Sequence, residues 1–149
     1  MKINISRTLV KGEITEGHLY IDGQEVCQTL ENTRNGLDAG LYVVNLVKCR
    51  QYARKMICLS RTATDGLFQS EACLRCEVNG EVFSNTLLPN FCPMIKPGNG
   101  IHNRLDGSLL VGRRNSLGSL VHPKPCFDAL YDRIRKSKER GREVTLEIQ

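Results

Sequence analysis

The residues of this chain that could do chemistry together lie between positions 96 and 115. His102 is followed by a carboxylate, Asp106, and by a hydroxyl, Ser108. An imidazole can remove the proton from a serine hydroxyl during attack on a carbonyl when a carboxylate orients its ring. These three residues are therefore the candidate catalytic group for acyl transfer or hydrolysis. The neighbouring polar and glycine residues are the candidate binding residues: Asn99, Gly100, Asn103, Arg104 and Gly107.

A turn between His102 and Ser108 would bring these two side chains together. The apolar flanks Ile101 and Leu109–Val111 enclose a stretch rich in turn-forming residues. If the flanks pair as a hairpin with residues 103–107 as its loop, the Cβ atoms of His102 and Ser108 stand about 5 Å apart. An ordinary hairpin shows the same pattern, with the imidazole satisfied beside the turn and the hydroxyl bonded to nearby backbone. The sequence leaves both alternatives open.

The rest of the chain has the pattern of short strands joined by turns. Alternating apolar and polar residues predict a first strand at Lys2–Val10 and a last strand at Val144–Ile148. Asp22-Gly23 and Asn79-Gly80 are two-residue turns typical of tight hairpins. Two further apolar runs contribute strands: Leu41–Val47 and Met56–Leu59. We expect about eight to ten short strands in all.

Prolines interrupt the segment from position 88 to position 100. Pro89, Pro93 and Pro97 remove backbone donors, so we expect neither a central strand nor a regular helix there. The segment leads directly into the candidate catalytic group. It is therefore expected to form one wall of a groove beside His102.

One helix is predicted near the C-terminus. Pro125 suits its first turn and Gly141 its end. Apolar residues recur at helical spacing on one face: Phe127, Leu130, Tyr131 and Ile134. We expect one domain, residues 1–149, that is mainly β with one C-terminal helix (α+β). Its antiparallel sheets should form a compact sandwich or a barrel-like domain.

The cysteines and the N-terminal sequence bear on the compartment. The chain shows no signal peptide and no apolar run of the roughly 20 residues that a membrane helix needs. We expect a cytoplasmic protein, and non-classical delivery to the cell wall stays open as an alternative. Its seven cysteines are expected to be free thiols that serve as small apolar residues. Only Cys73 and Cys76 are closely spaced, and one pair is too few for a zinc site. Neither a metal nor a cofactor is expected.

The formal net charge is +5, which raises the question of a nucleic-acid partner. The basic residues are spread along the chain, aromatic residues make up 5%, and tryptophan is absent, so nucleic-acid binding is disfavoured. The densest basic run, Arg133–Arg142, is interpreted as a solvated helix face with cations near the helix C-terminus, where the macrodipole favours them.

The candidate catalytic group resembles a known signature. Ile101-His102 and Gly107–Gly112 are similar to a small family of bacterial and phage-borne domains of unknown function. Its signature reads Ile-His-x-Gly-Asn, a short spacer, and then Gly-Cys-Ile-Leu-x-Gly. The likeness extends from the Asp-Gly hairpin and Thr29-Leu30-Glu31 to the Phe-Asp-Ala-Leu-Tyr helix. Around the signature that family is in turn faintly similar to L,D-transpeptidases, cell-wall enzymes with a β-rich domain and a catalytic Cys.

The match to the signature is partial. His102 and Gly107 match its first His and second Gly, whereas Ser108 stands at the position of the Cys. Asp106 stands where the transpeptidases keep a second His. A Cys beside a His can exist as a thiolate, but a Ser hydroxyl must lose its proton during attack. The resemblance therefore implies a site whose usual means of activation is missing.

Three function classes follow from these residues. The first is a catalytically degenerate, cell-wall-peptide-processing-like module that acts in binding or as an accessory of a phage, mobile element or effector system. Its partner would be a peptidoglycan peptide or another peptide ligand. The alternative is an active acyl-transfer or hydrolytic enzyme with Ser108 as nucleophile and His102 as base. A second alternative is a structural or nucleic-acid-associated protein. The sequence does not fix the oligomeric state.

Overall fold

The computed structural model describes residues 1–34, 36–49, 54–60, 67–69, 76–78, 81–85, 93–98, 108–117 and 119–149. The first strands are β1 (Lys2–Lys11), β2 (Ile14–Ile21), β3 (Gln24–Asn32), β4 (Gly40–Cys49) and β5 (Arg54–Ser60). Shorter strands follow: β6 (Leu67–Gln69), β7 (Cys76–Val78), β8 (Glu81–Asn85), β9 (Met94–Pro97), β10 (Leu109–Arg114) and β11 (Leu120–Val121). The helix α1 (Pro123–Glu139) and the strand β12 (Thr145–Ile148) complete the chain.

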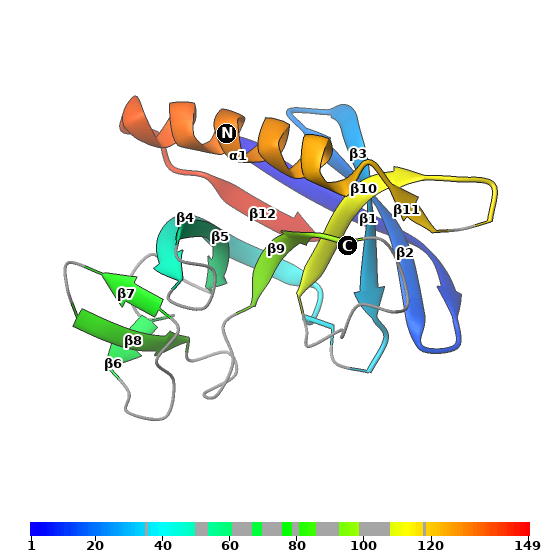
Figure 1. Ribbon diagram of the computed structural model, residues 1–149, viewed down its shortest axis with the longest axis horizontal. Helices are drawn as coiled ribbons and strands as arrows, with labels where there is room; N and C mark the ends of the chain where they lie inside the picture. The colour runs from blue at the N-terminus through cyan, green and yellow to red at the C-terminus, as the bar shows by residue number, and fades with distance from the viewer. Residues whose placement is uncertain are drawn as a thin grey trace.

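Eight strands close into a barrel in the order β12-β1-β2-β3-β10-β9-β5-β4. The barrel closes because β12 pairs with β1 on one side, where Ile3 faces Leu146, and with β4 on the other, where Tyr42 faces Leu146. Most neighbours are antiparallel, but β1–β12 and β9–β10 are parallel. Figure 1 shows β6, β7 and β8 as a small group beside the barrel, joined to it through β4. The prediction of a mainly β chain with a C-terminal helix is confirmed, and the form is a barrel.

The interior of the barrel is filled by the apolar residues of alternating positions. Ile3 lies opposite Ile21 on β2, and the next inward pair is Ile5 and Leu19. Cys27 on β3 lies opposite Leu19, so these side chains form successive layers inside the barrel. All five are at most 1% exposed. The alternation of apolar and polar residues that predicted the first strand therefore corresponds to side chains that face the interior and the exterior of the barrel in turn.

The predicted hairpins are confirmed where the structure describes them. Asp22 and Gly23 have φ angles of 48° and 87°, which is the pair of positive values that a tight hairpin turn requires. They join β2 to β3. Val78 and Glu81 pair across β7 and β8, on either side of the predicted Asn79-Gly80 turn.

The prediction that the proline-rich segment excludes a central strand is wrong. β9 lies between two strands of the barrel, with Ile95 paired to Ile57 of β5 and to Leu109 of β10. Its prolines stand at its two ends, where a missing N–H interrupts the ladder least. The carbonyl of Pro93 accepts a hydrogen bond from the N–H of Leu59 at 3.0 Å. A four-residue strand therefore fits between Pro93 and Pro97 without losing its central hydrogen bonds.

The helix α1 packs across one end of the barrel (Figure 1). Phe127, Leu130 and Ile134 are buried in the core, as their helical spacing predicts. The Arg54 guanidinium lies 4.9 Å from the ring centroid of Tyr131 and 5.6 Å from that of Phe127, which ties α1 to β5 by cation–π contacts. No helix among the described residues has the length and apolar character needed to cross a membrane.

The C-terminus of α1 is closed by a Schellman turn. Gly141, with φ of 73°, donates its N–H to the carbonyl of Lys138 at 2.9 Å. The N–H of Arg142 reaches back to the carbonyl of Ser137 at 3.1 Å. The prediction that Gly141 ends the helix is therefore confirmed, and the turn directs the chain into β12.

The other end of the barrel holds a buried ion pair. The Arg7 guanidinium donates to both carboxylate oxygens of Glu31, at 3.0 and 2.7 Å, and also to the carbonyl of Leu37. The Glu31 side chain is 1% exposed and that of Arg7 is 25% exposed. The carboxylate raises the pKa of Arg7 through its hydrogen bond. This pair joins β1, β3 and the segment that leads into β4.

Closure of the barrel by β12 can be tested with Leu146→Ala. Leu146 is fully buried between β1 and β4, so we expect the free energy of unfolding to fall by about 3 kcal/mol. Glu147→Ala, on the same strand, removes a surface pair with Lys2 and should cost less than about 1 kcal/mol. Urea denaturation measures both values. Equal losses for the two variants would contradict closure through Leu146.

The ion pair between Arg7 and Glu31 predicts a non-additive pair of substitutions. Arg7→Met leaves a buried carboxylate without its partner and should lower the free energy of unfolding by about 3 kcal/mol. The double variant Arg7→Met, Glu31→Met removes both charges and should be more stable than Arg7→Met alone. Urea denaturation of both variants and of the parent chain gives the comparison. A double variant less stable than Arg7→Met would contradict the assigned pairing.

Candidate functional site

Of the site residues predicted from the sequence, the structure describes Ser108 alone. The other catalytic and binding candidates lie outside the described residues: His102, Asp106, Asn99, Gly100, Asn103, Arg104 and Gly107. Ser108 directly precedes β10 and is 2% exposed. Its Oγ accepts a hydrogen bond from the N–H of Met94 at 3.4 Å. The hydroxyl is thus covered and is in contact with the first residue of β9.

The described part of β10 pairs with two strands of the barrel. On one edge of β10, Leu110 and Val111 face Leu30 and Thr29 of β3. On its other edge, β10 pairs in parallel with β9. Leu110 and Val111 therefore have a paired strand on each edge. Because His102 lies outside the described residues, the expected hairpin stays a prediction.

The described residues form two adjoining cavities on one side of α1, which we call the α1 groove. The apolar cavity, of about 400 Å³, lies between the N-terminal half of α1 and the β2–β3 hairpin and also reaches Arg113 of β10. The basic cavity, of about 430 Å³, lies beside the C-terminal half of α1 and extends to Met1 and Asp22. Arg133 lines both cavities. The groove is thus apolar at one end and cationic at the other.

Helical spacing places the lining residues of α1 on one face. Cys126, Leu130, Arg133, Ser137 and Arg140 follow one another at intervals of three or four residues. At the C-terminal end the Schellman turn brings Arg142 back beside Ser137. At the N-terminal end His122, in the left-handed region with φ of 51°, turns the chain from β11 into α1. The ends of the helix therefore set the ends of the groove.

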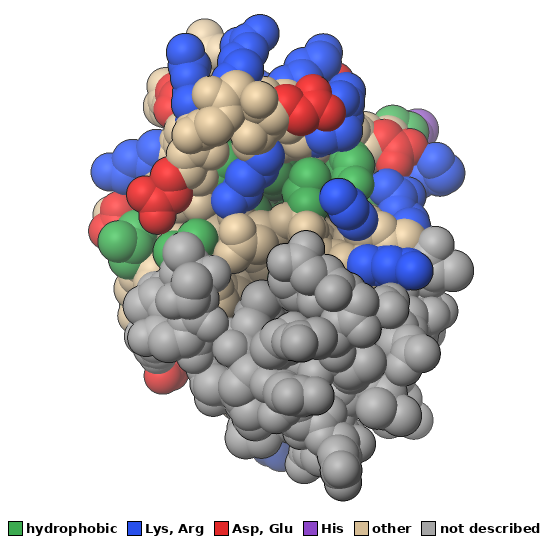
Figure 2. Space-filling view, turned by 90° about the vertical axis from the view of Figure 1, so that its left-hand side faces the viewer, with side chains coloured by type: hydrophobic (Ala, Val, Ile, Leu, Met, Phe, Trp, Pro, Cys, Tyr) green, Lys and Arg blue, Asp and Glu red, His purple; other side chains and the backbone are tan. Residues whose placement is uncertain are grey.

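The basic cavity holds cations without carboxylate partners. Arg133, Arg140 and Arg142 form no ion pair with another described residue, whereas Lys136 pairs with Asp132 at 2.9 Å. Figure 2 shows Lys and Arg side chains gathered over this end of the molecule, with some acidic side chains among them. The interpretation of 133–142 as a solvated helix face misses this cavity. The spacing of Arg133, Ser137 and Arg140 marks one face, but only the fold shows what faces it.

The apolar cavity contains two thiols, Cys27 and Cys126. Burial raises the pKa of the Cys27 thiol to about 12. A protonated, buried thiol is a poor nucleophile and a poor metal ligand. Within the described ranges there is no group of three His, Cys, Asp or Glu residues that could hold a metal ion. The described lining of the α1 groove therefore presents apolar side chains at one end and cations at the other.

No protein-family model, curated protein or solved structure matches the chain. The resemblance at Ile101-His102 and Gly107–Gly112 stays a prediction.

The two thiols of the apolar cavity should differ in reactivity. At pH 8 a thiol of pKa about 12 is thiolate in about one molecule in ten thousand, and Cys27 is also 1% exposed. Cys126 is partly exposed. Iodoacetamide should therefore alkylate Cys126 much faster than Cys27 in the folded chain, as followed by mass spectrometry of tryptic peptides. In urea the two rates should converge. Equal rates in the folded chain would contradict the described burial.

Proposed function

We propose that the chain is a catalytically degenerate, cell-wall-peptide-processing-like module that binds its ligand without reacting with it. It would act as a binding or accessory component of a phage, mobile element or effector system. The observation that carries this proposal is the burial of Ser108, which is 2% exposed. A nucleophile must reach the carbonyl carbon of its substrate, and a covered hydroxyl does not.

The contacts of Ser108 support the same proposal. Its Oγ accepts a hydrogen bond from the main chain of Met94, which suits a structural role at the start of β9 and β10. Attack by this oxygen would require both that the hydroxyl be uncovered and that a base remove its proton.

The ligand class follows from the resemblance to the cell-wall enzymes. We propose a peptidoglycan peptide or another peptide as the partner. Candidate contacts to that peptide remain Asn99, Gly100, Asn103, Arg104 and Gly107. In this reading the region around residue 102 keeps the ligand-binding part of the signature, while the Cys that would react is replaced by Ser108.

The test is incubation of the full chain with muropeptides, followed by mass spectrometry of the peptides and of the protein. We expect unchanged muropeptide masses and no adduct on Ser108, with purified peptidoglycan retaining the chain in a pull-down. Ser108→Ala should be retained equally and should lose only about 1 kcal/mol of stability, because the Met94 N–H loses its acceptor. Ser119→Ala, at an exposed position, is the matched control.

Two outcomes would contradict the proposal in different ways. A covalent adduct on Ser108, or a change in muropeptide masses that Ser108→Ala abolishes, would show an active enzyme. Failure of peptidoglycan to retain the folded chain would show that the ligand class is wrong.

A further inference from the structure

We propose that the α1 groove is a binding site for a phosphate monoester that carries an apolar group. The phosphate would lie in the basic cavity and the apolar group in the apolar cavity. This site is separate from the region around residue 102 and does not depend on the peptide ligand proposed above. Its support comes from charge, from one unpartnered buried hydroxyl and from Arg133, which lines both cavities.

The charge of the basic cavity favours an anion with more than one negative charge. Three guanidinium groups, those of Arg133, Arg140 and Arg142, line it without an ion pair to another described residue. Among the described residues of its lining the only carboxylate is that of Asp22, which accepts a hydrogen bond from the N–H of Lys2 at 3.2 Å. Guanidinium groups bind phosphate oxygens through paired N–H donors. A phosphate dianion would relieve the repulsion among the three cations.

Ser137 supplies the second, independent observation. It lines the basic cavity and is 8% exposed, and its Oγ has no hydrogen-bond partner. A buried hydroxyl is normally satisfied, and a helical serine commonly bonds back to the carbonyl one turn earlier. The Oγ is enclosed as it stands, so a rotation about the Cα–Cβ bond would have to turn it toward the cavity before it could donate a hydrogen bond to a phosphate oxygen. The Schellman turn keeps Arg142 beside this hydroxyl, because the N–H of Arg142 bonds to the Ser137 carbonyl.

The apolar cavity indicates what the rest of the ligand is. Arg133 lines both cavities, so an anionic group bound there can extend directly into the apolar part of the groove. Ile21 and Val26 from β2 and β3 and Leu130 from α1 all line this part. A volume of about 400 Å³ suits a single short alkyl or aromatic group. Arg113 and His122 also line it and add two further hydrogen-bond donors.

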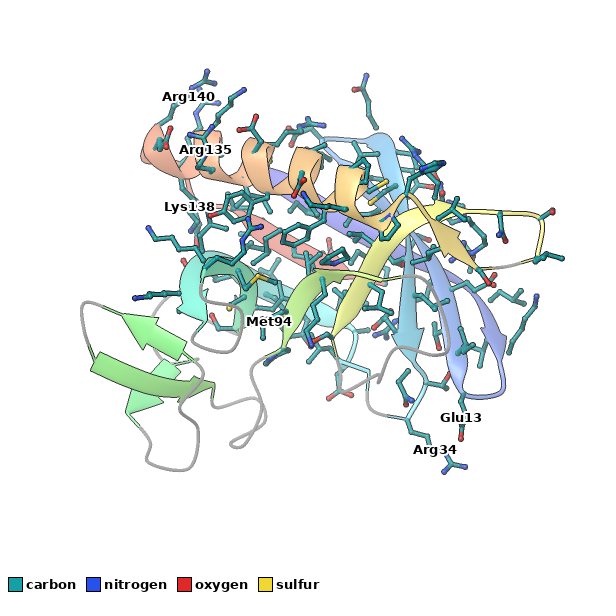
Figure 3. All side chains as sticks on the ribbon, in the orientation of Figure 1. Glu13, Arg34, Met94, Arg135, Lys138 and Arg140 are labelled. Atoms are coloured by element: carbon teal, nitrogen blue, oxygen red, sulfur yellow. The ribbon has the colours of Figure 1, made fainter. Side chains whose placement is uncertain are left out.

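The experiment is calorimetric titration of the full chain with octyl phosphate, inorganic phosphate and octanol. Octyl phosphate should bind at least about tenfold more tightly than inorganic phosphate, since burial of even two methylene groups gives that factor. Arg140→Gln and Arg142→Gln should each weaken octyl phosphate binding by about tenfold. Arg135→Gln is the matched control, because Arg135 lines neither cavity and pairs with Asp132 and Glu139. Figure 3 places Arg135 and Arg140 near the same end of α1.

Two further measurements separate a binding role from a structural one. Ser137→Ala should weaken octyl phosphate binding by about threefold or more without lowering the thermal midpoint, because the lost hydroxyl has no partner in the folded chain. Octyl phosphate should also slow the alkylation of Cys126 by iodoacetamide, whereas inorganic phosphate should not, since Cys126 lines only the apolar cavity.

Three results would overturn the assignment. The first is equal loss of affinity in Arg135→Gln and Arg140→Gln, which would show unspecific attraction to a basic surface. The second is no binding of octyl phosphate at millimolar concentration. The third is a protein that sediments with vesicles containing phosphatidic acid but does not bind octyl phosphate. That result would show a flat membrane-facing surface in place of a groove.

Discussion

The structure depends on the pairing of β12 with β1 and β4 at the same time. Without β12 the two halves of the barrel would present open edges, and the core around Ile3 and Tyr42 would lose Leu146, which lies between them. Backbone hydrogen bonds extend this closure beyond the strand. The N–H of Val44 bonds to the carbonyl of Val144, and the N–H of Thr145 bonds to the carbonyl of Met1. Because β12 follows the Schellman turn of α1 closely, barrel closure also fixes where the helix lies.

A closed barrel of this size leaves its ends as the places for ligands, since its interior is just wide enough to be filled by side chains. At one end α1 covers the opening and leaves the α1 groove between itself and the β2–β3 hairpin. Lys138 anchors that end of the helix, because its Nζ donates to Asn45 of β4 at 2.9 Å, on the barrel side of α1 in Figure 3. At the other end the ion pair of Arg7 and Glu31 occupies the space. The two ends therefore differ in what they can accept.

The sequence predicts those structural features that depend on residues close together in the chain. The alternation in β1, the positive φ angles at Asp22-Gly23 and the glycine that ends α1 are local, and each is found where expected. Contacts between distant segments could not be predicted. Nothing near Met94 indicates that a strand bounded by prolines will lie between β5 and β10, and nothing in the helix pattern shows that Ser137 faces a cavity. The burial of Ser108 also depends on contacts between distant segments, because it follows from the parallel pairing of β9 with β10.

The position of Ser108 gives a physical reason for a serine at this point of the chain. Pro93 has no N–H, so the ladder of β9 begins with the N–H of Met94, and the Oγ of Ser108 accepts from it. A hydroxyl is a good acceptor for such a bond, whereas a thiol sulfur is a weak one. A hydroxyl at this position therefore holds the first residue of β9 to the residue before β10 better than a thiol would.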